Sequence, residues 1–262
     1  MAQSWKTIES VVTEEGVLEL RQRGERDFMI MIGPQVLMNS LANRSEVVLG
    51  QHGCGHLKES ENPRVLVGGL GMGFTLRGVL DILPPSASVV VAELNPVVVQ
   101  WCRGPLALLT DNAVSDSRVT VEICDVAKLI RRSAVNGGES RFDAIVLDLY
   151  RGPHAKTDTK NDPLYGSRAI ENMRAALKPC GAVAVWGEQY DEGFDKRLRN
   201  AGFTVTTERP GRGGLRHAVF LAHLKQSKKS GMHFASGADG TFSGDPAGGV
   251  QDRRAFFRTV TS

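Results

Sequence analysis

This 262-residue chain has almost no excess of charge of either sign. It contains 32 basic and 29 acidic residues, which gives a net charge of +3. Such a balance gives no sign of a nucleic-acid or membrane surface. Long hydrophobic runs are missing too, since no apolar stretch approaches the ~18 residues of a membrane span. The first residues contain no apolar signal core. We therefore expect neither nucleic acid nor a membrane among the partners.

Cysteines are few and are not paired in the sequence. There are four, and no two form a CxxC pair, so neither a zinc site nor a redox dithiol is indicated. Cys102, Cys124 and Cys180 lie in or near apolar runs, as buried free thiols do. His52 and His56 have a spacing that suits a metal ion, but no acid or third ligand accompanies them. The sequence predicts a reduced, cytoplasmic protein without a metal site.

Most of the chain alternates between β-prone runs and segments of helix length. The β-prone runs are residues 65–67, 89–92, 120–123, 144–147 and 182–186, with a final pair at 204–206 and 218–221. Apolar strands separated by helices form a doubly wound α/β sheet that is buried on both faces. The expected fold class is α/β, with a Rossmann-like, mostly parallel sheet over residues 44–224.

The two ends of the chain differ from this pattern. Residues 5–40 contain short β-prone runs broken by turns, which predicts a small antiparallel β meander over residues 1–43. A meander can bury only one face by itself, so it must pack on the main domain or on a second subunit, which makes a homodimer plausible. Ser45 is expected to cap a helix that runs to residue 57. Residues 225–262 are rich in Gly, Ser and charge, so we expect a disordered tail.

A glycine-rich turn and two acids follow successive strands. Gly69, Gly71 and Gly73 let the backbone turn tightly and approach a ligand without a Cβ in the way. Glu93 ends the second strand, where a carboxylate can accept both ribose hydroxyls, and Asp125 ends the third, where it can accept from an adenine amino group. Each acid alone is as readily a solvated loop residue or a helix N-cap. Together with the glycines they predict an adenosine site at the carboxyl edge of the sheet.

At these residues the chain resembles the spermidine synthase-like (polyamine aminopropyltransferase) branch of the class I S-adenosylmethionine-dependent methyltransferase fold. The resemblance runs from about residue 17 to residue 224. Its segments are residues 68–77 (GGLGMGFTLR), similar to GGGDGGxxRE; 92–95 (AELN), similar to EID; 124–126 (CDV), similar to GDA or GDG; 142–148 (FDAIVLD), similar to YDxIxxD; and 186–188 (WGE), similar to QGE. The resemblance implies S-adenosylmethionine or its decarboxylated form as co-substrate, a small-molecule acceptor and no metal.

Two departures from the family pattern remove acids. The family's glycine loop has an Asp that faces the amine of decarboxylated S-adenosylmethionine, and Gly71 stands there. The family's DSxDP loop has two acids, of which Asp148 keeps the first while Arg151 replaces the second. Because two carboxylates attract a dicationic polyamine, their loss disfavours putrescine and leaves room for the carboxylate of intact S-adenosylmethionine. We therefore favour methyl or aminocarboxypropyl transfer, with aminopropyl transfer in polyamine synthesis as the alternative.

The acceptor side of the site is assigned to loops after the later strands. Asp148 would orient the acceptor or act as its base, and Tyr150 could offer its ring face to an amine or a sulfonium. Arginines between the last two strands could grip an anionic acceptor, although a basic hairpin tip exposed to water explains them equally well. The candidates for acceptor binding are Arg151, His154, Glu188 and Arg212.

Two other classes of function stay open at this stage. An NAD-dependent oxidoreductase shares the glycine loop and the ribose acid, but no catalytic Lys-Tyr or His-Asp pair accompanies them, and Asp125 and Asp148 are left without a role. A non-catalytic descendant could bind a nucleoside, or a partner protein through the β meander. The loss of two family acids is the feature that keeps this reading open.

Overall fold

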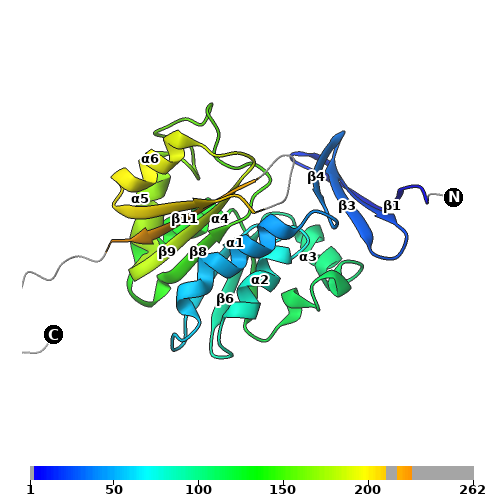
Figure 1. Ribbon diagram of the computed structural model, residues 1–262. Coiled ribbons are helices and arrows are strands. Elements are labelled where there is room, and N and C mark those ends of the chain that lie inside the picture. Colours follow the sequence, from blue (N-terminus) through cyan, green and yellow to red (C-terminus); the bar gives the residue numbers. More distant parts are fainter. Residues whose placement is uncertain (1–2, 211–216, 226–262) are drawn as a thin grey trace, which may run out of the picture. The chain divides into compact units, whose positions relative to one another are not determined.

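The smaller of two β-sheets comes first in the chain (Figure 1). A computed structural model describes residues 3–210 and 217–225, which lie in one compact unit that runs to Gln226. The small sheet is antiparallel with the order β1-β2-β3-β4, which confirms the predicted meander. Its strands are β1 (Lys6–Thr13), β2 (Gly16–Arg23), β3 (Asp27–Ile32) and β4 (Gln35–Asn39). The predicted disordered tail lies outside the described residues.

The larger sheet has seven strands in the order β10-β11-β9-β8-β5-β6-β7, and it is parallel except for β11, which runs antiparallel to both neighbours. The strands are β5 (Arg64–Gly68), β6 (Ser88–Glu93), β7 (Val119–Ile123), β8 (Phe142–Leu147), β9 (Leu177–Gly187), β10 (Phe203–Glu208) and β11 (Ala218–Leu224). From β5 the chain builds outward through β6 and β7 and then returns to β8 on the other side. Ligands bind at such a reversal of strand order, beyond the carboxyl ends of the strands.

Helices cover both faces of this sheet, as predicted for a doubly wound fold. They are α1 (Arg44–Cys54), α2 (Phe74–Ile82), α3 (Pro96–Arg103), α4 (Val126–Asn136), α5 (Ser167–Ala176) and α6 (Glu192–Asn200), with 3₁₀ turns η1 (Gly55–Leu57), η2 (Ala107–Leu109), η3 (Ala113–Ser115) and η4 (Gly138–Ser140). Within the described residues, no helix combines the length and the apolar character needed to cross a membrane.

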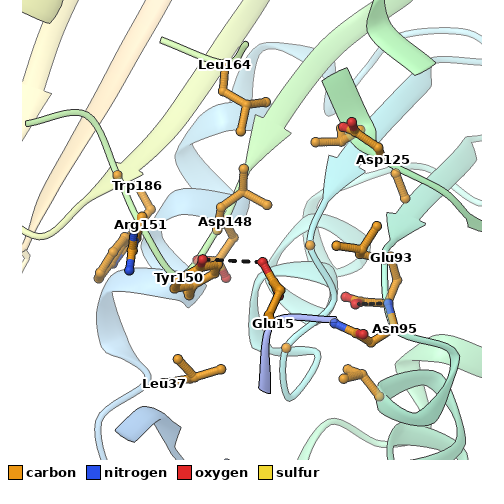
Figure 2. Close-up of a pocket in the computed structure, with 18 of the residues that line it drawn as sticks. Glu15, Leu37, Glu93, Asn95, Asp125, Asp148, Tyr150, Arg151, Leu164 and Trp186 are labelled. Carbon is orange, nitrogen blue, oxygen red and sulfur yellow. Dashed lines mark hydrogen bonds between the residues drawn. The ribbon is translucent and has the colours of Figure 1, made fainter. Parts of the chain in front are cut away.

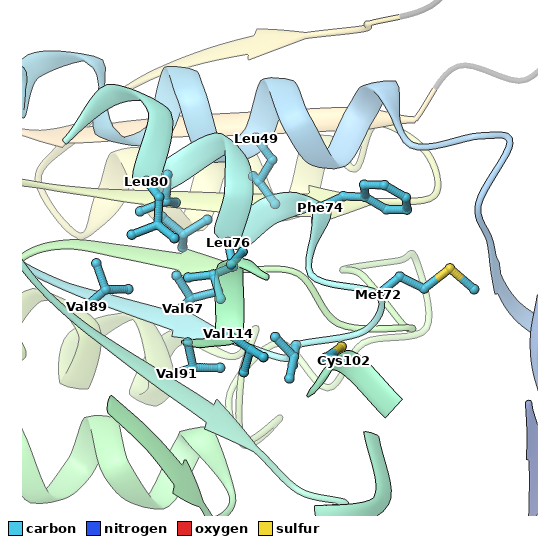
Figure 3. Packing of buried hydrophobic residues seen from close by; sticks show 14 of the residues in the cluster. Leu49, Val67, Met72, Phe74, Leu76, Leu80, Val89, Val91, Cys102 and Val114 are labelled. Carbon is cyan, nitrogen blue, oxygen red and sulfur yellow. The ribbon is translucent and has the colours of Figure 1, made fainter. Parts of the chain in front are cut away.

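Alternate side chains of the central strands supply the two hydrophobic cores. Val65 and Val67 of β5 pack with α1, α2 and α3, whereas Leu66 packs with α4, α5 and α6 on the other face. Figure 3 shows Val67 beneath Leu49 and Leu76 in the first of these cores. Each such side chain is fully buried and contributes about 1.5–3 kcal/mol of hydrophobic stabilisation.

The meander packs on the main sheet's first core through one face. Leu20 and Ile30 belong to that core, and the Trp101 indole N–H donates to Glu9 Oε2 at 2.7 Å, which ties α3 to β1. The opposite face carries Val12, whose side chain is 82% exposed.

Helix α1 begins two residues earlier than a Ser45 cap indicates, and Ser45 is not its cap. Asn43 occupies the N-cap position, and its side chain makes no capping hydrogen bond. The Ser45 hydroxyl lies in the first turn and donates to Glu46 Oε2 at 2.7 Å instead. Helix α1 and η1 together span the predicted helix through Leu57.

Candidate functional site

A cavity of about 670 Å³ opens at the carboxyl ends of the parallel strands, next to the meander (Figure 2). It lies where ligands bind in open α/β sheets and has the size of a small-molecule site. Most of the residues chosen from the sequence line it together: Gly69, Gly71, Glu93, Asp125, Asp148, Tyr150, Arg151 and His154.

The glycine turn brings backbone, not side chains, to the cavity wall. Gly69 has φ +82°, and a Cβ there would lie 2.3 Å from the Asp148 carbonyl oxygen, so no other residue fits without a shift. Gly71 has φ +52°, and the thioether of Met38 from β4 packs against it. Met38 Sδ also accepts a hydrogen bond from the Met72 N–H at 3.2 Å. Gly73 does not line the cavity; its left-handed conformation turns the chain into α2.

Glu93 ends β6 and is held by the backbone around it. Its Oε2 accepts from the Leu70 N–H at 2.9 Å in the glycine turn, and its Oε1 accepts from the Asn95 N–H at 2.8 Å. Burial raises the pKa of Glu93, and those two backbone donors oppose the rise. Each carboxylate oxygen has a second lone pair, so the side chain can still accept from a ligand hydroxyl.

Asp125 combines the two roles that the sequence left open. It is the N-cap of α4, where its Oδ1 accepts from the Ala127 N–H at 2.8 Å, and it also lines the cavity. Capping uses one carboxylate oxygen, so the other can still accept a hydrogen bond.

Asp148 lies just beyond the end of β8, beside the glycine turn. Its N–H donates to the Gly68 carbonyl at 2.8 Å, and its Oδ2 lies 2.6 Å from the Thr75 hydroxyl of α2. Burial raises the pKa of Asp148 to about 7, the nearby charge of Glu46 adds to the rise, and the Thr75 hydrogen bond opposes it. A carboxyl that titrates near neutral pH suits proton transfer.

The loop after Asp148 forms the outer wall. The Tyr150 hydroxyl lies 3.4 Å from Glu15 Oε1 at the turn between β1 and β2, and the Arg151 guanidinium stands 5.3 Å from the Tyr150 ring centroid (Figure 2). The Tyr165 hydroxyl donates to the Arg151 carbonyl at 2.7 Å. Gly152 packs directly on the backbone at the end of β9, where a Cβ would come within 2.5 Å of Gly187 Cα. These contacts hold the loop at both of its sides.

One further predicted residue, Glu188, is not brought into the cavity wall. Glu188 follows the end of β9 and is exposed, and it is not among the lining residues, although Trp186 two positions earlier is. Arg212 lies outside the described residues.

Sequence reasoning missed the acids that other elements bring to the cavity. Glu14 and Glu15 come from the β1–β2 turn, and Glu46 comes from the first turn of α1. No motif identifies them, because only the packing of the meander and α1 on the strand ends brings them close. Together with Asp162 and the predicted Glu93, Asp125 and Asp148, they make seven carboxylate residues that line the cavity. Only one Lys and one Arg line it with them. The wall therefore suits a cationic ligand. Among the described residues no group of three or more side chains could hold a metal ion.

No family model matches the chain. Curated relatives include polyamine aminopropyltransferase 2 of Pseudomonas aeruginosa, 30% identical over 141 residues (52% of this chain, 37% of that protein), and a spermine synthase of Saccharomyces cerevisiae, 26% identical over 141 residues (53% and 43%). A polyamine aminopropyltransferase of Clostridium tetani is 36% identical over 88 residues (33% and 29%). The matches thus span less than half the length of these relatives.

Solved structures match over more of the chain. Spermidine synthase from Thermotoga maritima superposes with a TM-score of 0.64 and 19% identity, covering 85% of this chain and 74% of that one. A spermidine synthase in complex with the transition state analogue AdoDATO gives a TM-score of 0.64 at 18% identity. The chain is thus similar in sequence to polyamine aminopropyltransferases over about half of its length and alike in fold to spermidine synthase.

Proposed function

We propose that this protein transfers an aminopropyl group from decarboxylated S-adenosylmethionine to an amine. The observation that carries the proposal is the surplus of carboxylates around the cavity, seven against one Lys and one Arg. Decarboxylated S-adenosylmethionine carries a sulfonium and an ammonium, and an amine acceptor is protonated in water. A wall of carboxylates attracts such partners and repels anionic ones.

The donor is assigned to the side of the cavity formed by β5, β6 and β7. Glu93 accepts from the ribose hydroxyls, Asp125 accepts from the adenine amino group, and the backbone at Gly69 and Gly71 faces the propyl chain. The buried position of Glu93 and the free oxygen of Asp125 support these roles. An NAD-dependent oxidoreductase would give Asp125 and Asp148 no role.

Transfer needs little covalent chemistry from the protein, because the sulfonium is already an activated leaving group. Asp148 takes a proton from the acceptor ammonium, and the freed nitrogen lone pair attacks the propyl carbon bound to sulfur. The carbon–sulfur bond breaks, and its electrons stay on sulfur, leaving methylthioadenosine. The main contribution of the site is to hold nitrogen, carbon and sulfur in line.

The loss of two family acids favoured intact S-adenosylmethionine as donor, but further observations support its decarboxylated form. Aminopropyltransferases among the relatives support the decarboxylated donor. The space beside Gly71 holds the Met38 thioether, so replacing an Asp by Gly there does not leave room for a substrate carboxylate. Glu15 and Glu46 offset the negative charge lost at Gly71 and Arg151. Methyl or aminocarboxypropyl transfer to an anionic acceptor keeps one supporting observation, the exposed Arg151 at the cavity wall.

The test is a transfer assay read by mass spectrometry. Each donor, S-adenosylmethionine or its decarboxylated form, is incubated with diamines, polyamines and carboxylate-bearing amines. We expect methylthioadenosine and an aminopropylated amine from the decarboxylated donor only. Methyl or aminocarboxypropyl products from the intact donor would overturn the proposal. Adenosyl binding without turnover across all acceptors would favour a non-catalytic descendant. Light scattering on the same sample tests the predicted homodimer.

A further inference from the structure

Glu46 is a buried acid at the cavity for which no motif assigns a role. Glu46 is only 6% exposed, yet it lines the same cavity as Asp148, and its charge acts on that residue. Its Oε2 accepts from the Ser45 hydroxyl at 2.7 Å, and Ser45 Oγ in turn lies 3.3 Å from the Trp186 indole nitrogen. Within residues 3–210 and 217–225 no Lys, Arg or His forms an ion pair with Glu46. Because carboxylates are rarely buried without a partner of opposite charge, we expect a cation to complete this site.

Close packing of two helices sets the place of Glu46. A Cβ on Gly50 of α1 would lie 2.4 Å from the Thr75 carbonyl oxygen, and one on Gly78 of α2 would lie 2.6 Å from the Val47 carbonyl oxygen. The two backbones therefore touch at the glycines. This contact brings the Thr75 hydroxyl to 3.1 Å from the Glu46 carbonyl oxygen and 2.6 Å from Asp148 Oδ2.

The Thr75 hydroxyl has only one hydrogen for these two acceptors. If Asp148 is ionised, the hydroxyl donates to it and leaves the Glu46 carbonyl without this bond. If the Asp148 carboxyl carries a proton, it donates to Thr75, and Thr75 donates to the Glu46 carbonyl, so all three groups are satisfied. An Asp148 that holds a proton therefore keeps both contacts of the Thr75 hydroxyl. The raised pKa of Asp148 agrees with this assignment.

We propose that Glu46 is the second acid of the acceptor site, so that a carboxylate pair from α1 and the end of β8 binds the ammonium group of the acceptor. The pair takes the place of the two acids on one loop, of which the second is Arg151 here. The proposal rests on the proposed function for the nature of the acceptor. Its structural half, the coupling of Glu46 to the proton on Asp148, does not.

The proton balance follows from this pair. An entering ammonium replaces the Asp148 proton as the positive charge between the two acids, and that proton leaves to solvent. In the transfer step Asp148 takes one N–H proton from the ammonium as the carbon–nitrogen bond forms and the carbon–sulfur bond breaks. The nearby negative charge of Glu46 keeps the proton affinity of Asp148 high.

Other ionisable groups also surround Asp148, and the test must separate them from Glu46. The other ionisable residues that line the same cavity are Glu14, Glu15, Glu93, Cys124, Asp125, Lys128, Tyr150, Arg151, His154, Asp162 and Tyr165. Of these, Tyr165 is coupled to Asp148, whose charge adds to the burial that raises the tyrosine pKa.

The test is a direct titration of Asp148 by carbon NMR of the full chain carrying carboxyl-labelled aspartate, with Asp148→Asn to assign the signal. We expect Asp148 to titrate near neutral pH in the wild type and lower in Glu46→Gln, by on the order of one pH unit. Glu46→Asp and Ser45→Ala keep the charge and should leave the raised value. Glu59→Gln, an exposed acid just past η1, is the matched control and should change nothing. An unchanged titration in Glu46→Gln overturns the proposal.

Acceptor kinetics separate this proposal from the proposed function. With a diamine acceptor, Glu46→Gln should raise KM by about tenfold, equal to ~1.4 kcal/mol, while the Kd of methylthioadenosine stays within about twofold. If wild type transfers to amines and Glu46→Gln leaves KM unchanged, the proposal fails and the proposed function stands. If no amine accepts but the titration shifts as expected, the carboxylate pair stands and the proposed function fails.

Discussion

Replacing Gly69 by alanine tests the contact that joins the glycine turn to the proposed catalytic loop. Gly69 adopts φ +82°, and its amide donates to the Ala92 carbonyl at 2.9 Å. A Cβ at this position would lie 2.3 Å from the Asp148 carbonyl oxygen and 3.1 Å from Leu149 Cδ2. The leucine side chain can move, but the carbonyl belongs to backbone that is itself hydrogen-bonded to Gly68.

The cost has two parts. The left-handed conformation costs an alanine about 1–2 kcal/mol. Forcing the Asp148 backbone away from the turn adds about 1–3 kcal/mol, the usual cost of inserting a carbon into a packed interior. Gly69→Ala should therefore lower the free energy of unfolding by about 2–5 kcal/mol, and because Asp148 must move, adenosyl ligands should bind at least about tenfold more weakly.

Gly138→Ala is the matched control. Gly138 has φ +53°, and a Cβ there would meet nothing within 4 Å, so it reports the conformational cost alone. Urea unfolding of both variants, with calorimetric titration of methylthioadenosine, measures the two effects. If Gly69→Ala and Gly138→Ala lose equal stability and both keep the wild-type affinity, the contact between the glycine turn and Asp148 contributes neither to stability nor to ligand binding.

Three further predictions concern single side chains. Asp148→Asn should stabilise the protein more at pH 8 than at pH 5, as urea unfolding would measure. The pKa of Asp148 is about 7 in the folded state and 3.8 in the unfolded state. The wild type therefore loses stability as the pH rises from 3.8 to about 7, on the order of 4 kcal/mol in all. An equal gain at both pH values would contradict the raised pKa. Met38→Ala should open the space beside Gly71 and improve the Kd of S-adenosylmethionine relative to its decarboxylated form, as competitive titration would measure; an unchanged ratio argues against Met38 as a determinant of donor choice. Trp101→Phe should lower the free energy of unfolding by about 1 kcal/mol, because the hydrogen bond to the exposed Glu9 is lost, and Glu9→Gln, which keeps an acceptor, should lose less.

The sheet and its order of elements were predictable because their signals are local. The buried strands read as apolar runs, and a glycine or an acid marks where each one ends. The four-stranded extent of the meander was harder to predict, because β1 is mostly exposed, β4 is only half-buried, and neither shows much apolar alternation. Ser45 was misread as a cap because the helix already begins at Arg44. Its hydroxyl contacts Glu46 next to it and also the Trp186 indole N–H, a tertiary contact that no local rule foresees.

The donor half of the site was predictable for the same reason, since parallel strands must end at one edge. The acceptor half was predicted only in part. Asp148, Tyr150, Arg151 and His154 follow β8 directly, whereas Glu15 and Glu46 reach the cavity from elements far away in sequence. The motifs therefore showed the acids lost at Gly71 and Arg151 but not Glu15 and Glu46, which restore negative charge to the site. The contact of Met38 with Gly71 could not be predicted for the same reason, because β4 and the glycine turn are far apart in sequence.

The central claim is that Glu93 and Asp125 hold one adenosine between them, and calorimetric titration of methylthioadenosine tests it most directly. Glu93→Gln keeps an acceptor oxygen, and Asp125→Asn keeps a good helix cap, so neither variant should unfold the chain. Each should weaken binding at least about tenfold, whereas Glu139→Gln on the exposed turn η4 should leave it unchanged. Wild-type affinity in both site variants, or tight NAD binding without any adenosyl binding, would contradict the account.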